Sequence, residues 1–305
     1  MNNLPWSRPG RFYRGNLHTH SNRSDAPLTP AEVVAEYAPH GYDFLAITDH
    51  FTESFGFPIV DTRELRTERF TTLLGAELHA PAIEVGERWH ILAVGLPLDF
   101  APNLPGEDGP SLAVRAAAAG AFVAIAHPAW YSLTLDDALS LTAAHAVEVH
   151  NETCRWLNDR GDGWHVLDML LARGRRLLAV ATDDAHFKER PDRRGAWVHV
   201  RAERLDPDAL LAALKAGHFY SSQGPELREV RVEGDRLRVV CSPATGVFLS
   251  GRGSKGAAVT GEGLQEAELS VERFAGSYCR LTVVDAAGKR AWTNPIWLDR
   301  EPPVS

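Results

Sequence analysis

The segment GNLHTHSNRSDAPLTPAE, residues 15–32, joins a short apolar run, two histidines and the start of a helix. Thr29 can cap that helix, Pro30 suits its first position and Glu32 can complete a capping box. A strand followed closely by a helix is the repeating unit of α/β folds. The segment therefore predicts a βα unit whose strand ends at the pair of histidines.

Short apolar runs alternate with helical patterns over the first two thirds of the chain. This alternation is typical of a largely parallel α/β sheet, either a closed barrel or a doubly wound sheet. The strand candidates are GNLHTH (15–20), YDFLAITDH (42–50), TLLGAELHA (72–80), WHILAVGL (89–96), AFVAIAHP (121–128), AVEVHN (146–151), LLAVATDDAH (177–186) and AWVHVR (196–201).

Beyond GHFYSSQGPE (217–226) the pattern changes to short strand-like runs separated by glycine-bearing turns. This change predicts a small all-β, sandwich-like domain over residues 226–305, after an α/β domain over residues 1–225. The three cysteines lack CxxC spacing, and we expect them to be packing residues. A disulfide between Cys241 and Cys279 is the alternative, which a reducing compartment would oppose.

The composition is that of an ordinary globular protein, with 44% hydrophobic and 24% charged residues among 305. The net charge of -8 disfavours an extended nucleic-acid partner. No run approaches the roughly 20 apolar residues that a membrane span needs, and the first residues lack the apolar core of a signal peptide. We therefore expect a cytoplasmic protein with no membrane partner.

Histidines and carboxylates recur where the apolar runs end. In parallel α/β barrels the loops after the strands converge on one face, so these side chains are expected to meet. Imidazole together with carboxylate suits zinc, manganese or iron. The candidates from this pattern are His18, His20, His50, Glu77, His90, His127, Asp184 and His186.

Six motifs in order, HTHSNRSD, ITDH, GAE, WHILAVG, AHP and TDDAH, resemble the PHP family, named for polymerase and histidinol phosphatase domains. The resemblance spans roughly residues 14–190 and implies a distorted, seven-stranded TIM-like barrel holding two or three divalent ions. It implies nine ligands: His18, His20, Asp25, His50, Glu77, His90, His127, Asp184 and His186. SSQGPE and the β-rich segment ending GKRAWTNPIW resemble the carbaryl-hydrolase-like branch, in which a β-domain follows the barrel.

The resemblance also implies how the ligands divide among the ions, with Glu77 bridging two of them. A carboxylate has two oxygens and can bridge, whereas a neutral imidazole offers one lone pair. The expected sets are His18, His20 and Asp184 for one bridged ion, His90 and His127 for the other, and Asp25, His50 and His186 for a third. His79 is the nearest rival to this set, and the spacing Asp-x-His favours Asp184 over Asp183.

Two ions a few ångströms apart lower the pKa of a shared water, so a metal-bridged hydroxide can attack a phosphoester. Leaving-group protonation requires an acid, for which His150, Asp49 and Asp183 are alternatives. Asp49 could instead orient His50. The candidate catalytic residues are Glu77, Asp184, His150, Arg190 and Arg194.

A basic segment follows the last expected ligand. Its residues Lys188, Arg190, Arg193 and Arg194 could bind a substrate anion. The alternative is a solvated loop in which Glu189 and Asp192 are interspersed. Four tryptophans near the ends of the runs, Trp89, Trp130, Trp156 and Trp164, could line a pocket, although aromatic residues more often pack cores.

The sequence therefore predicts a metal-dependent phosphoesterase that cleaves a small phosphorylated substrate. Ligand spacing does not distinguish a phosphoester from a carbamate or carboxyl ester, so an ester hydrolase is one alternative. A noncatalytic, metal-stabilised binding module is another. The sequence predicts no oligomeric state.

Overall fold

The computed structural model describes residues 4–298. Its first ten strands are β1 (Arg11–Asn16), β2 (Phe44–Ile47), β3 (His50–Phe51), β4 (Thr71–Ala80), β5 (Trp89–Val94), β6 (Phe122–Ile125), β7 (Ala146–Asn151), β8 (Leu178–Thr182), β9 (Trp197–Ala202) and β10 (Phe219–Ser222). The α-helices are α1 (Pro30–Tyr37), α2 (Gly109–Ala118), α3 (Leu135–Ser140), α4 (Glu152–Asn158), α5 (Trp164–Ala172) and α6 (Pro207–Lys215). Each run expected to be a strand in this part overlaps one, but β1 ends at Asn16, before the two histidines at which that strand was expected to end.

The predicted helix start at Thr29 is confirmed. The Thr29 hydroxyl accepts from the backbone N–H of Glu32, and the Glu32 carboxylate accepts from the Thr29 N–H at 2.8 Å. Short 3-10 helices cover Pro5–Ser7, Ala38–His40, Glu53–Phe55, Arg63–Leu65 and Glu272–Phe274. No helix within residues 4–298 is long and apolar enough to cross a bilayer.

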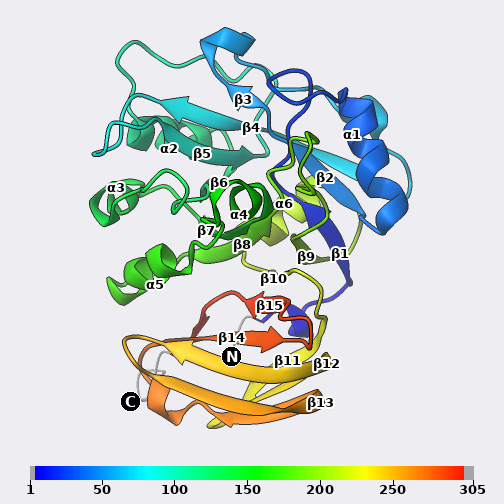
Figure 1. Cartoon of the computed structure of the whole chain (residues 1–305), viewed down its shortest axis with the longest axis vertical. Coiled ribbons are helices and arrows are strands. Elements are labelled where there is room, and N and C mark those ends of the chain that lie inside the picture. Colours follow the sequence, from blue (N-terminus) through cyan, green and yellow to red (C-terminus); the bar gives the residue numbers. More distant parts are fainter. Residues whose placement is uncertain (1–3, 299–305) are drawn as a thin grey trace.

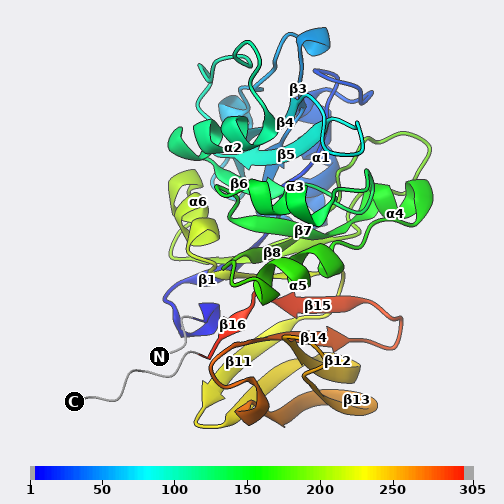
Figure 2. The same ribbon diagram turned by 90° about the vertical axis from the view of Figure 1, so that its left-hand side faces the viewer.

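The last strands are β11 (Leu227–Glu233), β12 (Arg236–Gly251), β13 (Gly256–Ser270), β14 (Tyr278–Val284), β15 (Arg290–Thr293) and β16 (Ile296–Trp297). They form the lower part of the molecule in Figure 1, while the helices gather around the strands of the upper part. Figure 2 shows the same division from the side. The expected runs RLRVV and GVFLS are joined in the single strand β12, in which the pairing register with β13 shifts beside Ala244.

All sixteen strands belong to one hydrogen-bonded sheet, whose central order is β11-β12-β14-β15-β10-β9-β1-β2-β4-β5-β6-β7-β8. The expectation of a largely parallel sheet is only partly met. Strands β1, β2 and β4 pair in parallel, as do β6, β7 and β8. However, β4 pairs antiparallel with β5 because residues 81–88 form a short connection without the helix that a parallel crossover needs.

The two ends of the α/β part of the sheet approach one another. The Ser221 hydroxyl on β10 donates to the Ala179 carbonyl of β8 at 2.8 Å and accepts from the Ala181 N–H at 3.1 Å. An isolated parallel bridge joins Thr19 to Ala185, in the segments that follow β1 and β8. Because Thr19 and Ala185 lie beside candidate ligands, this approach brings the ends of β1 and β8 to one site.

The C-terminal strands have their own apolar core, which includes Leu237, Val247 and Leu281. This core also contains Cys241 and Cys279, which are both buried and both free. The alternative, a disulfide between them, is therefore not present. The cysteines therefore pack as expected.

Candidate metal centre

Strand register places three of the candidate histidines around Glu77. His50 on β3 pairs with Glu77 on β4, and His79 on β4 pairs with His90 on β5. Side chains two residues apart on a strand point to the same face, so Glu77 and His79 project together between His50 and His90. His18 and His20 flank Thr19 and share one side for the same reason.

The Glu77 carboxylate lies at the middle of the cluster and is 1% exposed. Its Oε1 is 2.7 Å from Nδ1 of His90 and 3.0 Å from Nε2 of His127. Its Oε2 is 2.7 Å from Nδ1 of His50 and 3.7 Å from Nε2 of both His18 and His20. Each oxygen thus faces a different set of imidazoles, as a bridging carboxylate requires.

Asp184 supplies a second central carboxylate. Its Oδ1 is 2.8 Å from Nε2 of His20 and 3.3 Å from Nε2 of His18, and its Oδ2 accepts from the Asn151 amide at 3.1 Å. Asp184 has a φ of 56° and His127 one of 24°, a region that non-glycine residues seldom occupy. Such backbone strain is concentrated at functional sites.

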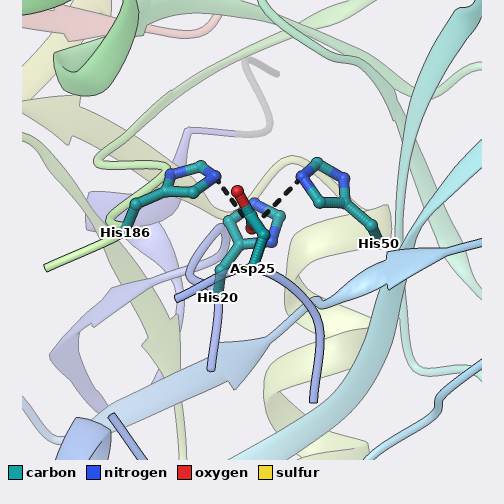
Figure 3. A group of neighbouring side chains, drawn as sticks. All are labelled: His20, Asp25, His50 and His186. Carbon is teal, nitrogen blue, oxygen red and sulfur yellow. Dashed lines mark ion pairs between the residues drawn. The ribbon is translucent and has the colours of Figure 1, made fainter. Parts of the chain in front are cut away.

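Figure 3 shows a third grouping, in which Asp25 is surrounded by His20, His50 and His186. Asp25 Oδ1 lies 3.3 Å from Nε2 of His186 and 3.5 Å from Nε2 of His50. Asp25 Oδ2 accepts from the Lys188 ammonium at 2.9 Å. Lys188 thus holds one Asp25 oxygen and leaves the other facing the histidines.

The structure brings all nine expected ligand residues into overlapping groups whose ligand atoms lie within 4.8 Å of one another. Two groups follow the expected division, namely Glu77 with His90 and His127, and Glu77 with His18 and His20, whereas others add to it. His20 joins Asp25, His50 and His186, while Asp184 groups with His18 and His127. His79 joins His50 and Glu77, a position that the sequence alone did not assign to it.

The buried polar atoms of the cluster fit divalent cations. His18 Nε2, Glu77 Oε2, Asp25 Oδ1 and His127 Nδ1 are buried and have no hydrogen-bond partner within the described chain. Buried polar atoms are normally paired, and imidazole nitrogens mixed with carboxylate oxygens are the donors that zinc, manganese and iron accept. The donor set therefore suits such ions.

The protonation of the cluster is uneven. Burial, together with the charges of His186 and His50, lowers the pKa of His20 to about 3, so the neutral ring offers one lone pair. Burial also opposes a charged His186, but the nearby carboxylates of Asp25 and Asp184 raise its pKa to about 9. A cation bound beside Asp25 would take the place of the His186 proton.

Glu148 on β7 is a buried carboxylate at the cluster that the sequence analysis missed. Its Oε1 is 2.7 Å from Nδ1 of His18 and accepts from the Thr182 hydroxyl, while its Oε2 accepts from the backbone N–H of His127 at 2.7 Å. A carboxylate on Nδ1 keeps the proton there, so Nε2 of His18 presents its lone pair to the cluster. The available signal was a glutamate within the apolar run AVEVHN.

Asp183 and Asp184 have separate tasks. The Asp183 carboxylate accepts from the Tyr37 hydroxyl at 2.8 Å and from the backbone N–H groups of residues 194–196 at 2.7–2.9 Å. Burial raises the pKa of Asp183 to about 7, although these donors favour the charged form. Asp183 thus anchors the segment after the basic loop, and it is not placed to protonate a leaving group.

Paired substitutions should separate these two tasks. We expect Asp184→Asn to lose bound metal, whereas Asp183→Asn should keep it and lose about 3 kcal/mol of unfolding free energy, because an amide NH₂ would face N–H donors. Elemental analysis and urea unfolding measure the two effects. Equal metal loss in both variants would show that the assignment of Asp184 as the ligand is wrong.

His79 orients His50. Its Nδ1 lies 3.0 Å from the Trp89 carbonyl, which can only accept, so Nδ1 carries the proton and Nε2 is an acceptor. Nδ1 of His50 lies 2.8 Å from that Nε2 and 2.7 Å from Glu77 Oε2, two acceptors that favour a proton on Nδ1. Nε2 of His50 is thereby left with its lone pair facing Asp25.

Removing the His79 side chain should weaken the binding of one ion and leave the binding of the others unchanged. We expect His79→Ala to lower metal affinity about 10-fold at the Asp25 group, the usual effect of losing such a partner. Ions retained per chain after dialysis against metal buffers give the measurement, with exposed His40→Ala as the control. Wild-type retention in His79→Ala would rule out this role.

Several other expected site residues lie elsewhere. Asp49 accepts from the Ser21 N–H and the Ser24 hydroxyl, so it holds the loop after His20 and does not orient His50. Arg194 donates to Glu36 at 3.0 Å and faces away from the cluster. His150 lies 2.8 Å from Glu152 and lines a different cavity. Proximity along the chain did not determine the direction of these side chains.

A pocket of about 250 Å³ opens over the cluster. Its lining includes the cationic Lys188 and Arg190 and the apolar Trp130 and Leu157. Of the other tryptophans, Trp89 is in the core, Trp156 is exposed and Trp164 lines the cavity of His150.

The basic loop is not simply solvated. Asp192 is 1% exposed, and it accepts from the His186 N–H at 2.9 Å and from the Thr153 hydroxyl at 3.3 Å. Asp192 therefore fixes the loop so that part of it faces the pocket.

Neither a family model nor a curated protein matches this chain. Among solved structures it is similar to a two-domain protein from Bacteroides vulgatus described as containing a predicted PHP-like metal-dependent phosphoesterase, with a TM-score of 0.53, 14% identity, and 91% of this chain and 93% of that chain covered. This likeness shows a shared mixed α/β fold.

Two further structures are similar over smaller parts of this chain. One is described as a metal-dependent phosphoesterase from Bifidobacterium adolescentis, with a TM-score of 0.43, 17% identity, and 67% of this chain and 96% of that chain covered. The other is an amidohydrolase from Chromobacterium violaceum with bound sulfate. Its TM-score is 0.41 and its identity 18%, and the match covers 56% of this chain and 87% of that chain.

Proposed function

We propose that this protein is a metal-dependent hydrolase that cleaves a phosphoester bond in a small substrate. The observation that carries the proposal is the position of Glu77, whose two oxygens face different imidazole sets beneath a pocket that also contains Lys188 and Arg190. The fold shared with a protein described as containing a PHP-like phosphoesterase supports it.

The nine expected ligands, with Glu77 as the bridge, would hold two or three divalent ions of manganese, zinc or iron. Such ions supply Lewis acidity and positive charge for attack by water on phosphorus. The protein's own part is to fix their ligands: Glu148 orients His18, His79 orients His50, and Asn151 holds Asp184.

The lining of the pocket offers the substrate both positive charge and apolar surface. Arg190 offers a planar fork for phosphate oxygens, and Lys188 adds charge next to Asp25. Trp130 and Leu157 supply apolar surface that excludes water. A volume of about 250 Å³ suits a small molecule and is too small for a folded polymer.

We also propose the finer features implied by the sequence. These are a TIM-like barrel over residues 1–225, a sandwich-like domain over residues 226–305, and membership of the carbaryl-hydrolase-like branch. A cytoplasmic location, and the absence of membrane and extended nucleic-acid partners, belong to the same proposal.

A substrate panel tests the reaction class. Metal-reconstituted protein should release phosphate from phosphomonoesters or cleave phosphodiesters, assayed beside aryl carbamates and carboxyl esters. Turnover confined to carbamates or carboxyl esters would replace the phosphoesterase by an ester hydrolase. Metal binding without turnover of any of these compounds would favour a binding module.

The role of the basic loop can be tested with two neighbouring arginines. We expect Arg190→Ala to raise KM about 10-fold, because it removes a charged fork from the phosphate. Arg193→Ala is the matched control, since Arg193 lies 3.0 Å from Glu36 and does not line the pocket. Steady-state kinetics on the best panel substrate give both values, and equal effects would argue against a direct role for Arg190.

A further inference from the structure

A second cavity lies where β7, α4 and α5 meet the C-terminal strands β14 and β15. We call it the seam cavity, and its volume is about 540 Å³. It shares no lining residue with the pocket over the metal centre. The seam cavity is of the size that small-molecule ligands occupy.

Strand register places the C-terminal contribution on one face. Thr282 pairs with Trp292 across β14 and β15, and alternation puts Arg280 beside Thr282 and Arg290 beside Trp292. All four line the seam cavity. The Trp292 ring on β15 lies 6.0 Å from the Trp164 ring on α5, and both rings line the cavity.

Two of the four cationic side chains that line the seam cavity have no ion-pair partner among the described residues. Arg280 is paired with Asp168 at 2.8 Å, and Arg155 with Glu152 at 2.7 Å. In contrast, neither the Lys289 ammonium nor the Arg290 guanidinium has an ion-pair partner within residues 4–298. Two carboxylates, Asp159 and Asp162, also line the cavity, but within residues 4–298 neither forms an ion pair with Lys289 or Arg290.

Two polar groups from the aromatic side of the cavity add hydrogen-bonding capacity. Trp164 is 8% exposed, and its indole Nε1–H is buried without a hydrogen-bond partner in the described chain. The Gln223 amide lies 3.2 Å from Nε2 of His150, whose ring stacks on Trp292 at 6.2 Å. A buried donor without a partner is costly, so an acceptor from a ligand would relieve it.

We propose that the seam cavity binds an organic anion that carries an aromatic ring. Lys289 and Arg290 bind the acidic group, while Trp164 and Trp292 contact the ring. The proposal does not rest on the phosphoesterase activity, because the two pockets have no residue in common.

Calorimetric titration of the full chain with naphthalene-2-sulfonate tests this proposal. The probe has a ring and an anion but no ester that a hydrolase could cleave. We expect Lys289→Ala/Arg290→Ala to weaken binding at least 10-fold. Arg252→Ala/Lys255→Ala removes two exposed cations from the turn between β12 and β13, outside the cavity, and should leave binding unchanged.

Three further titrations make the test specific. Methanesulfonate and 2-naphthalenemethanol, which separate the anion from the ring, should each bind at least 10-fold more weakly than the probe. Lys188→Ala/Arg190→Ala should bind the probe as the wild type does. The proposal fails if binding is lost in that variant, survives in Lys289→Ala/Arg290→Ala, or is equally tight for the neutral ring.

Discussion

Replacing Glu77 by Gln should reduce turnover about 1,000-fold or more, equal to about 4 kcal/mol of transition-state stabilisation. The two carboxylate oxygens face separate imidazole sets, with His90 and His127 on one side and His50 on the other. A glutamine keeps the shape but replaces one oxygen by an NH₂ group, which has no lone pair for a cation. One side of the bridge would therefore be lost.

The matched control is Glu87→Gln, an exposed carboxylate in the connection between β4 and β5. It changes the net charge equally and should leave kcat unchanged. Both variants should be compared at saturating metal, with metal content measured beside the rate. If Glu77→Gln kept more than a tenth of the wild-type kcat, Glu77 could not be the bridge.

Removing the ions should abolish turnover and also lower the melting temperature. The cluster buries Glu77 and Asp184 among histidines, and ions that bind only the folded chain stabilise it by about 2.7 kcal/mol at 100 times their Kd. Chelation followed by gel filtration gives the metal-free protein, and calorimetry and phosphate release give the two readouts. Adding back manganese, zinc or iron separately should restore both.

The control for this experiment is the Glu77→Gln variant, whose melting temperature should respond less to added metal. Full turnover by protein with less than about one ion per ten chains would contradict metal dependence. A rise in melting temperature without recovered turnover would favour a metal-stabilised binding module.

Local sequence patterns predicted the helices and strands well, because the signals for capping and for apolar strands lie within a few consecutive residues. The Thr29 capping box formed as expected, and a strand formed in each of the apolar runs before residue 202. The histidine pair at positions 18 and 20 lies with Glu77, since an extended segment turns alternate side chains to one side.

The directions and partners of side chains could not be predicted in the same way, because they depend on contacts between segments that are distant in the sequence. Arg190 faces the pocket whereas Arg194, only four residues later, pairs with Glu36. His150 points toward the C-terminal strands, while its neighbour Asn151 holds Asp184. Glu148 acts through contacts with three separate segments, which no short motif reveals.

Anomalous diffraction from metal-loaded crystals, measured at the absorption edge of the bound metal, tests the central claim most directly. We predict at least two peaks within coordination distance of Glu77, one beside each carboxylate oxygen, and further density near Asp25 if a third ion binds. Metal-loaded, folded protein with no peak in contact with Glu77 would contradict the proposed metal centre.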